Sequence, residues 1–137
     1  DLQLTPELIL QASKVMSSAP DTKIVLCHAG SPADRSEHGL EKWSRDLRLL
    51  SDMDNIFCKL SGLGMFDHNW TENSIAPIVN ECLQQFGPSR CMFGSNFPVD
   101  SLYSDYSSLI KAYRKIIPRV ASETVFDKTA RDFYKIH

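Results

Sequence analysis

The sequence of 137 residues lacks several features that would point to a macromolecular partner. Its net charge is −2 and it has no block of like charge, so the basic stripe typical of nucleic-acid-binding proteins is missing. No apolar run approaches the roughly 20 residues that cross a bilayer, and the first residues do not resemble a signal peptide. We therefore expect neither a nucleic-acid partner nor a membrane partner.

Cysteine pairs of the C-x-x-C type are also missing, although the sequence contains four cysteines. Three of these residues, Cys27, Cys58 and Cys91, lie inside apolar runs that have the character of strands. Cysteine in such runs behaves as a small buried hydrophobe. The pattern favours reduced thiols in a cytoplasmic protein, rather than disulfides or a zinc site.

Two common catalytic or cofactor-binding motifs are absent as well. Ser95 does not lie in a G-x-S-x-G elbow, so a serine hydrolase has little support. The Gly62-Leu63-Gly64 segment lacks the further spaced glycine of a dinucleotide-binding fingerprint. We interpret that segment as part of a turn.

What the sequence does contain is a regular alternation of apolar runs and amphipathic segments, within an ordinary globular composition. Strands are expected at residues 23–27, 55–60 and 91–94, and helices at 6–16, 40–51, 71–86, 103–117 and 122–134. The expected strands begin about 32 and 35 residues apart, which is the repeat of a βα unit. The alternation predicts an α/β fold with a parallel sheet.

The number of strands is small for the architecture that this alternation implies. Three strands, or four if Leu2 and Leu4 end another, make about half of a (β/α)8 barrel, which needs roughly 250 residues. The sequence also begins at Asp1 rather than at methionine. We therefore expect residues 1–137 to form one partial barrel domain of a longer protein.

Polar side chains follow the expected strands where each of them ends. His28 follows the first strand, Lys59 and Ser61 lie at the end of the second, and Asn96 and Asp100 follow the third. Because the carboxyl ends of barrel strands meet at one mouth, these side chains are expected to converge there.

Two of these positions leave more than one interpretation open. If Lys59 points inward it could polarise a carbonyl or pair with a substrate carboxylate, whereas an outward Lys59 would lie at a packing rim. Cys27 and His28 are neighbours on a strand, so their side chains are expected to point to opposite faces. Arg35 and His38 in the following loop would either bind an anionic or hydroxylated substrate or belong to a solvated loop.

Four motifs in order resemble the C-terminal half of the amidohydrolase 2 family, in the amidohydrolase superfamily. They are His28-Ala29-Gly30-Ser31-Pro32, Lys59-Leu60-Ser61-Gly62-Leu63, Phe86-Gly87-Pro88-Ser89-Arg90-Cys91-Met92-Phe93-Gly94-Ser95-Asn96-Phe97-Pro98 and Thr129-Ala130-Arg131-Asp132-Phe133-Tyr134. The resemblance covers nearly the whole chain and is strongest to the branch of sugar-lactone hydrolases and 2-pyrone-4,6-dicarboxylate lactonase.

The resemblance implies a distorted (β/α)8 TIM barrel in which this chain supplies strands six to eight and the C-terminal helices. His28 would be the histidine at the end of strand six. Asn96 falls where the superfamily usually carries an aspartate at the end of strand eight. The His-x-His pair of strand one is absent from this sequence.

The resemblance also implies a hydrolase that opens a lactone or related cyclic ester of a small carbohydrate or aromatic-degradation intermediate. Members of this branch can work without a divalent metal, so no cofactor is required and no metal ligand is assigned. The implied site has His28, Asp100 and Asn96 as catalytic residues, with Lys59, Ser61 and Arg35 binding the substrate. The 137-residue chain alone would be inactive.

The amide at position 96 has three interpretations, because an asparagine cannot act as a general base. Asp100 takes over as the base; or Asn96 orients water or substrate while another group transfers the proton; or hydrolytic activity has been lost.

Two other functions remain open. One is a metal-dependent decarboxylase or hydrolase of the same family, whose divalent metal, such as zinc, would be bound mainly by the other half of the barrel. The other is an inactive half-barrel that associates with a second copy or with the missing half, because unpaired sheet edges invite pairing.

Overall fold

The computed structural model describes residues 1–136 and is organised around a three-stranded parallel sheet. The strands are β1 (Ile24–Leu26), β2 (Ile56–Leu60) and β3 (Cys91–Phe93), and they lie in that order. Leu2 adds a parallel bridge to Leu26, at the outer edge of β1. The parallel sheet expected from the sequence is confirmed, with the strands slightly shorter than the apolar runs.

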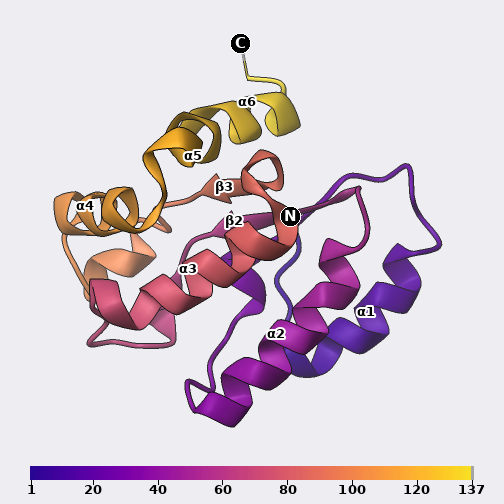
Figure 1. The fold of residues 1–137 in the computed structure, drawn as a ribbon, viewed down its shortest axis with the longest axis horizontal. Helices are drawn as coiled ribbons and strands as arrows, with labels where there is room; N and C mark the ends of the chain where they lie inside the picture. The colour runs from indigo at the N-terminus through magenta and orange to yellow at the C-terminus, as the bar shows by residue number, and fades with distance from the viewer. Residues whose placement is uncertain (137) are drawn as a thin grey trace.

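Helices separate the strands in the alternation that the sequence predicts (Figure 1). They are α1 (Ile9–Met16), α2 (Glu37–Ser51), α3 (Glu72–Phe86), α4 (Tyr106–Ile116), α5 (Arg119–Glu123) and α6 (Thr129–Tyr134). Side-chain caps fix where several of them begin. Ser36 accepts a hydrogen bond from Gly39 N at the start of α2, and Thr71 and Ser74 form a capping box on α3.

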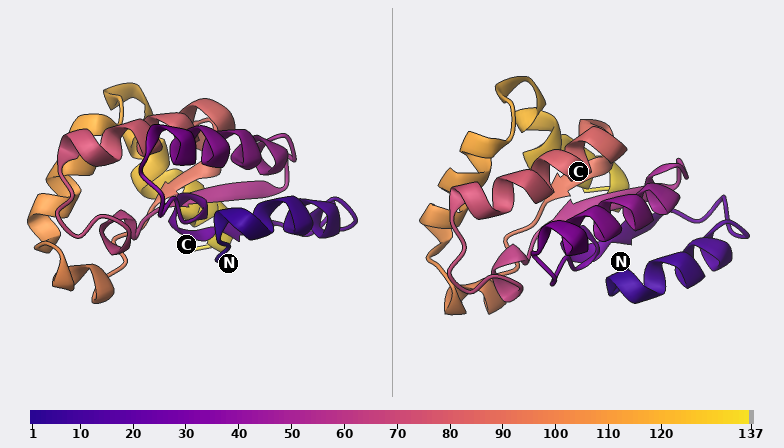
Figure 2. Two further views of the ribbon diagram at one scale, coloured as in Figure 1. Left: turned by 90° about the horizontal axis from the view of Figure 1, so that it is seen from below. Right: turned by 60° about the horizontal axis from the view of Figure 1, so that its bottom comes forward.

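Both faces of the sheet are covered by helices, which explains why every strand residue except Lys59 is apolar. The thiol of Cys58 on β2 packs against Cys82 of α3, on the same side as α1 and α2. The adjacent Phe57 points the other way, and its ring centroid lies 4.9 Å from that of Phe133 at α6. Figure 2 shows from two further directions that α1 and α2 lie together, away from the C-terminal segment.

The C-terminal helical segment differs from the expectation of one helix over 122–134. Helix α5 begins at Arg119, directly after Pro118, and continues through one π-helical turn, Thr124–Lys128, into α6. The π turn buries Val125 and brings the ring of Phe126 to 4.8 Å from that of Phe93 on β3. Pro118 sets the start because its fixed φ is suited to the position before a first helical turn.

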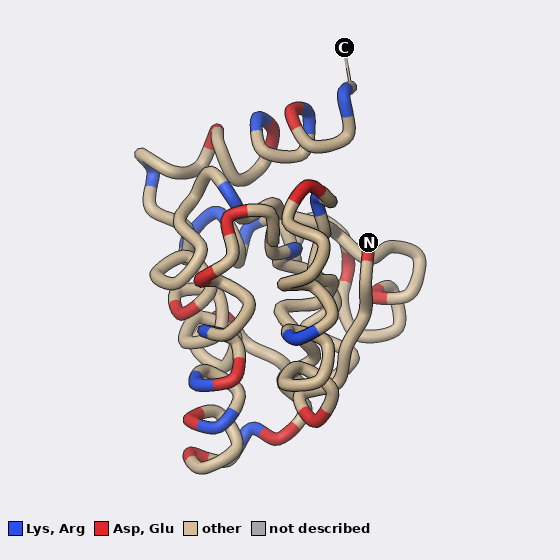
Figure 3. The backbone as a smooth tube through the Cα atoms, turned by 90° about the vertical axis from the view of Figure 1, so that its right-hand side faces the viewer, with Lys and Arg blue, Asp and Glu red and all other residues tan. Residues whose placement is uncertain are grey.

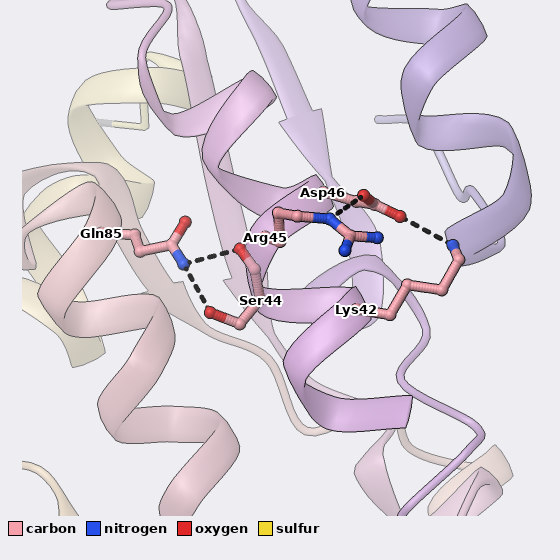
Figure 4. Close-up of polar contacts among 5 residues, drawn as sticks. All are labelled: Lys42, Ser44, Arg45, Asp46 and Gln85. Atoms are coloured by element: carbon pink, nitrogen blue, oxygen red, sulfur yellow. Dashed lines mark hydrogen bonds and ion pairs between the residues drawn. The ribbon is translucent and has the colours of Figure 1, made fainter. Parts of the chain in front are cut away.

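Polar contacts join α2 to α3 on the outside of the sheet (Figure 4). The Gln85 side-chain amide donates to Ser44 O at 2.9 Å and to Ser44 Oγ at 3.2 Å. On α2 itself, Lys42 Nζ lies 2.7 Å from Asp46 Oδ2. Such partly exposed ion pairs contribute little stability, so the hydrophobic core between the helices and the sheet dominates.

Charged residues of both signs alternate along the helices seen in Figure 3, without a large area of one sign. Among residues 1–136, no helix is long and apolar enough to cross a membrane.

Arg90 ties the end of α2 to the start of β3, and its replacement by alanine is expected to destabilise the fold. Its guanidinium donates to the carbonyl oxygens of Ser51 and Met53, each at 2.8 Å, and of Ile56 at 3.2 Å. Three carbonyls would lose a charged donor, so we expect Arg90→Ala to lower the free energy of unfolding by about 2–3 kcal/mol in urea denaturation. Arg48→Ala, at an exposed position of α2, should change it by less than about 0.5 kcal/mol. Equal midpoints for the two variants would contradict this role.

Candidate functional site

The carboxyl ends of the three strands open into one cavity of about 430 Å³. Four of the residues singled out in the sequence line it: His28, Lys59, Ser61 and Asn96. The remaining lining residues are mostly apolar and come from the strand ends and the C-terminal segment: Cys27, Met92, Phe93, Gly94, Ala130, Tyr134 and Ile136. Two further predicted site residues, Arg35 and Asp100, do not line this cavity.

His28 reaches the cavity through a left-handed turn, η2 (Cys27–Gly30), directly after β1. The backbone φ is 55° at His28 and 53° at Ala29, a region that residues with a side chain seldom adopt. The turn brings His28 Nδ1 to 2.9 Å from Ser61 Oγ. It also overturns the expectation that Cys27 and His28 point to opposite faces, because the strand ends at Leu26 and both side chains line the cavity.

Gly62 allows the imidazole of His28 to lie this close to β2. Its φ is +63°, and a Cβ at this position would lie 2.5 Å from His28 Nδ1 and 2.8 Å from Met65 Cε. Any larger residue would displace the ring or the backbone. The sequence identified Gly62 only as part of a turn; its position next to the polar end of a strand was the one signal of its relation to the site.

The environment of His28 keeps its imidazole neutral near pH 7. Burial lowers the pKa of His28 below the usual 6.5, and the positive charge of Lys59 acts in the same direction. The hydrogen bond with Ser61 and the negative charge of Asp100 oppose this shift. A neutral imidazole that uses Nδ1 for Ser61 has Nε2 left to interact with a molecule in the cavity.

Asn96 faces the cavity, and Asp100 lies behind it. The side-chain amide of Asn96 donates to Asp100 Oδ1, four positions further along the chain, at 2.8 Å. Asp100 is only 1% exposed, in the short helical turn η5 (Val99–Leu102). Burial raises the pKa of Asp100, while the Asn96 hydrogen bond and the charge of His28 counteract this. Direct contact with a molecule in the cavity is therefore available to Asn96 and not to Asp100.

Lys59 points inward, toward the face of the sheet that carries α6. Its ammonium lies 2.5 Å from Asp1 Oδ2 and 5.2 Å from the centre of the Tyr134 ring. The Tyr134 hydroxyl donates to the same carboxylate, at 2.7 Å from Asp1 Oδ1. These contacts hold a cation at the wall of the cavity that β2 contributes, between the strands that lead to His28 and Asn96.

Arg35 joins two loops outside the cavity. Its Nη2 donates to the carbonyl oxygen of Leu63 at 3.3 Å, which links the loop after β1 to the turn after β2. Burial lowers the pKa of the Arg35 guanidinium, although the charge of Asp67 opposes this. His38, which was expected in the same loop, lies instead in the first turn of α2 and is exposed. The structure does not bring Arg35 or His38 to the cavity.

A metal centre needs several donors that converge on one point. Residues 1–136 contain no group of three or more His, Cys, Asp or Glu side chains placed to hold a metal ion. Among the described residues, the histidine at the cavity is paired with Ser61, and the nearby carboxylate of Asp100 is covered by the Asn96 amide. The described residues by themselves therefore do not fit a resident metal.

Comparison with known proteins identifies relatives over almost the full length of the chain. An uncharacterized protein of Sinorhizobium fredii, y4mH, is 39% identical over 139 residues, which cover 99% of this chain and 46% of that protein. An L-fucono-1,5-lactonase of Burkholderia multivorans is 36% identical over 104 residues, which cover 66% of this chain and 35% of that enzyme. The chain spans at most about half the length of the curated relatives that it matches.

Solved structures give the same result for the fold. A crystal structure of an amidohydrolase from Burkholderia multivorans with bound zinc superposes with a TM-score of 0.92 at 26% identity, over 100% of this chain and 52% of that one. The described chain is thus part of a barrel of the amidohydrolase type, as the sequence predicted. The family model for amidohydrolases matches residues 1–136. The chain therefore belongs to the amidohydrolase family, and its parallel strands follow one another in sequence order within an α/β architecture.

Proposed function

We propose that the whole protein hydrolyses a lactone or related cyclic ester of a small carbohydrate or aromatic-degradation intermediate. The observation that carries this proposal is the cavity at the strand ends, which gathers a neutral histidine, a lysine and an amide. The relatives named L-fucono-1,5-lactonase support an ester of a sugar acid as the substrate class.

In the proposed reaction His28 is the general base. With Nδ1–H donating to Ser61 Oγ, the Nε2 lone pair takes a proton from the water that attacks the ester carbonyl. The new C–O bond gives a tetrahedral oxyanion, and this collapses with cleavage of the ring C–O bond. The imidazolium of His28 then returns its proton to the alkoxide that leaves, so the products are the hydroxyl and carboxyl ends of the opened ring.

Asn96 and Lys59 would stabilise the negative charge of that oxyanion. One N–H of the Asn96 amide is bound to Asp100, which leaves the second N–H to donate into the cavity. The Lys59 ammonium, which is paired with Asp1, supplies a positive charge at the wall that β2 contributes. Preformed donors of this kind often provide the largest part of the rate enhancement in acyl transfer.

Asp100 supports this site from behind rather than contacting the substrate. Its carboxylate holds the Asn96 amide, and its negative charge favours the protonated form of His28 during the reaction. In this assignment Asn96 orients the reacting groups and His28 carries the proton. Ser61 holds the ring of His28, and Arg35 holds the loop that precedes α2.

A metal-dependent reaction is the second candidate, because the Burkholderia multivorans amidohydrolase was solved with bound zinc. The residues of this chain do not fit a metal by themselves, so such an ion would need ligands from the rest of the protein. No step of the proposed reaction passes through a metal.

The proposal is tested by assaying the whole protein with L-fucono-1,5-lactone and monitoring acid release. We expect ring opening that survives dialysis against EDTA, with less than stoichiometric zinc by elemental analysis. Activity that is lost with the chelator and restored by zinc would favour the second candidate. No ring opening of this substrate, of other aldonolactones or of pyrone lactones would refute the lactonase proposal. Residues 1–137 alone should be inactive in each case, because they span about half the length of the matched relatives.

A further inference from the structure

Three polar atoms behind the cavity are buried without a hydrogen-bond partner among the described residues. They are Asp100 Oδ2, the Tyr113 hydroxyl and Arg35 Nε. Asp100 and Tyr113 are each only 1% exposed. Buried polar groups are nearly always paired with protein atoms or with ordered water, so three such atoms in one region require an explanation.

The three groups belong to one cluster. Tyr113 comes from α4, and its ring lies edge-on to Phe93 at the end of β3, with the centroids 5.0 Å apart. Burial raises the pKa of Tyr113, and the negative charge of Asp100 raises it further. The positive charge of Arg35 acts on the same phenol in the opposite direction. The hydroxyl of Tyr113 therefore lies close enough to both charges to respond to them.

The hydrogen-bonding capacities of the three atoms are complementary. Arg35 Nε can only donate, Asp100 Oδ2 as a carboxylate oxygen can only accept, and a phenol hydroxyl does both. A chain of hydrogen bonds that leads from Arg35 Nε through the Tyr113 hydroxyl to Asp100 Oδ2 would give each of these three atoms a partner. Because no direct bond joins them, this arrangement would need a bridging water molecule, which is common for buried polar groups.

We propose that Tyr113 is a positioning residue, which holds the Asp100 carboxylate through a buried water and so fixes Asn96 at the wall of the cavity. Arg35 completes this chain of hydrogen bonds at the end away from Asp100. The inference rests on the proposed function for its catalytic meaning, because Asn96 faces the substrate only there. The placement of Asp100 by Tyr113 does not depend on which substrate the cavity takes.

The expected consequence is an effect of Tyr113 on the titration of Asp100. The titratable group that acts on Asp100 is His28 from η2; Asp100, Cys82, Cys58 and Arg35 act on Tyr113, and Asp67 and Tyr113 act on Arg35. A donor hydrogen bond favours the charged carboxylate. Removing the hydroxyl should therefore raise the pKa of Asp100 above its value in the unmodified chain.

The test is an NMR titration of the full 137-residue chain with ¹³C-labelled aspartate, in which the Asp100 signal is assigned by its loss in Asp100→Asn. In Tyr113→Phe we expect the Asp100 midpoint to move to higher pH by at least about 0.5 unit. Tyr106→Phe removes a hydroxyl from an exposed position of the same helix and should leave the midpoint unchanged. A midpoint that is the same in Tyr113→Phe and the unmodified chain would overturn the proposal.

A second measurement keeps the proposal testable if Tyr113→Phe does not fold. A high-resolution crystal structure of the unmodified chain should show an ordered water within about 3.2 Å of both the Tyr113 hydroxyl and Asp100 Oδ2. An apolar side chain that fills this space instead would refute the bridge. Neither measurement uses activity, so a negative lactone assay would refute the proposed function and leave this result standing.

Discussion

His28→Ala is expected to lower kcat/KM of the whole protein on its lactone at least 100-fold. Removal of a general base typically costs between about 100-fold and 10,000-fold, and in the proposed reaction His28 alone accepts the proton of the attacking water. The measurement is the initial rate of ring opening at pH 7 over a range of lactone concentrations. His38→Ala removes an exposed histidine and should leave kcat/KM within about two-fold.

The pH dependence of the rate gives a separate check on His28. Because burial lowers the pKa of His28 below 6.5, the imidazole is neutral at pH 7 and becomes protonated only in more acidic solution. A protonated ring has no lone pair to accept a proton, so the rate should fall toward low pH with a midpoint below 6.5. A midpoint above 7, or an unchanged rate in His28→Ala, would show that another group is the base.

Gly62→Ala is expected to lower kcat/KM about 10- to 100-fold although it removes no group that carries the chemistry. The new Cβ would lie 2.5 Å from His28 Nδ1, so the imidazole must move away from Ser61. Displacement of a catalytic group by about 1 Å can cost about 100-fold in rate. The hydrogen bond between His28 and Ser61 should also be lost, which would appear as a shift of the His28 ring signals in NMR.

The matched control for this variant is Gly87→Ala. Gly87 also has a positive φ, of +75°, but nothing lies within 4 Å of the Cβ that alanine would add there. Gly62 is left-handed, with φ 63° and ψ 18°, so Gly62→Ala should lose about 1–2 kcal/mol of stability from backbone strain. Gly87, with φ 75° and ψ 158°, lies in a region almost restricted to glycine, so Gly87→Ala should lose about 1–3 kcal/mol. Only Gly62→Ala should lose activity; equal losses in both variants would show that strain, rather than contact with His28, is responsible.

Much of the fold could be predicted from the sequence, because its strands are apolar and its helices amphipathic. The runs that include Val25, Cys58 and Met92 read as strands covered on both faces, and the repeat of about 32 to 35 residues between them required parallel pairing. The boundaries of the last helices were less predictable. The π turn of Thr124–Lys128 depends on the packing of Val125 and Phe126 against the sheet, which no local pattern encodes.

The sequence by itself identified four of the residues that line the cavity, although two others that it proposed, Arg35 and Asp100, do not line it. His28, Lys59, Ser61 and Asn96 each stand at the end of a strand, and the carboxyl ends of parallel strands share one edge whatever the loops do. It could not determine the direction of those side chains. The left-handed backbone at His28 and Asn96 turns both residues away from the alternation of the strands.

The tertiary structure decided which side chain after β3 faces the cavity and which one is buried behind it. From the sequence alone, Asn96 and Asp100 were equal candidates for contact with the attacking water, because both follow β3 within a few residues. The backbone bond from Asp100 N to Asn96 O, at 3.1 Å, folds the loop back and buries Asp100 behind the amide, within reach of Tyr113 from α4. Spacing along the chain fixes which end of a strand a residue follows. Which of two nearby residues of a loop faces the cavity depends on how helices from other parts of the chain pack against that loop.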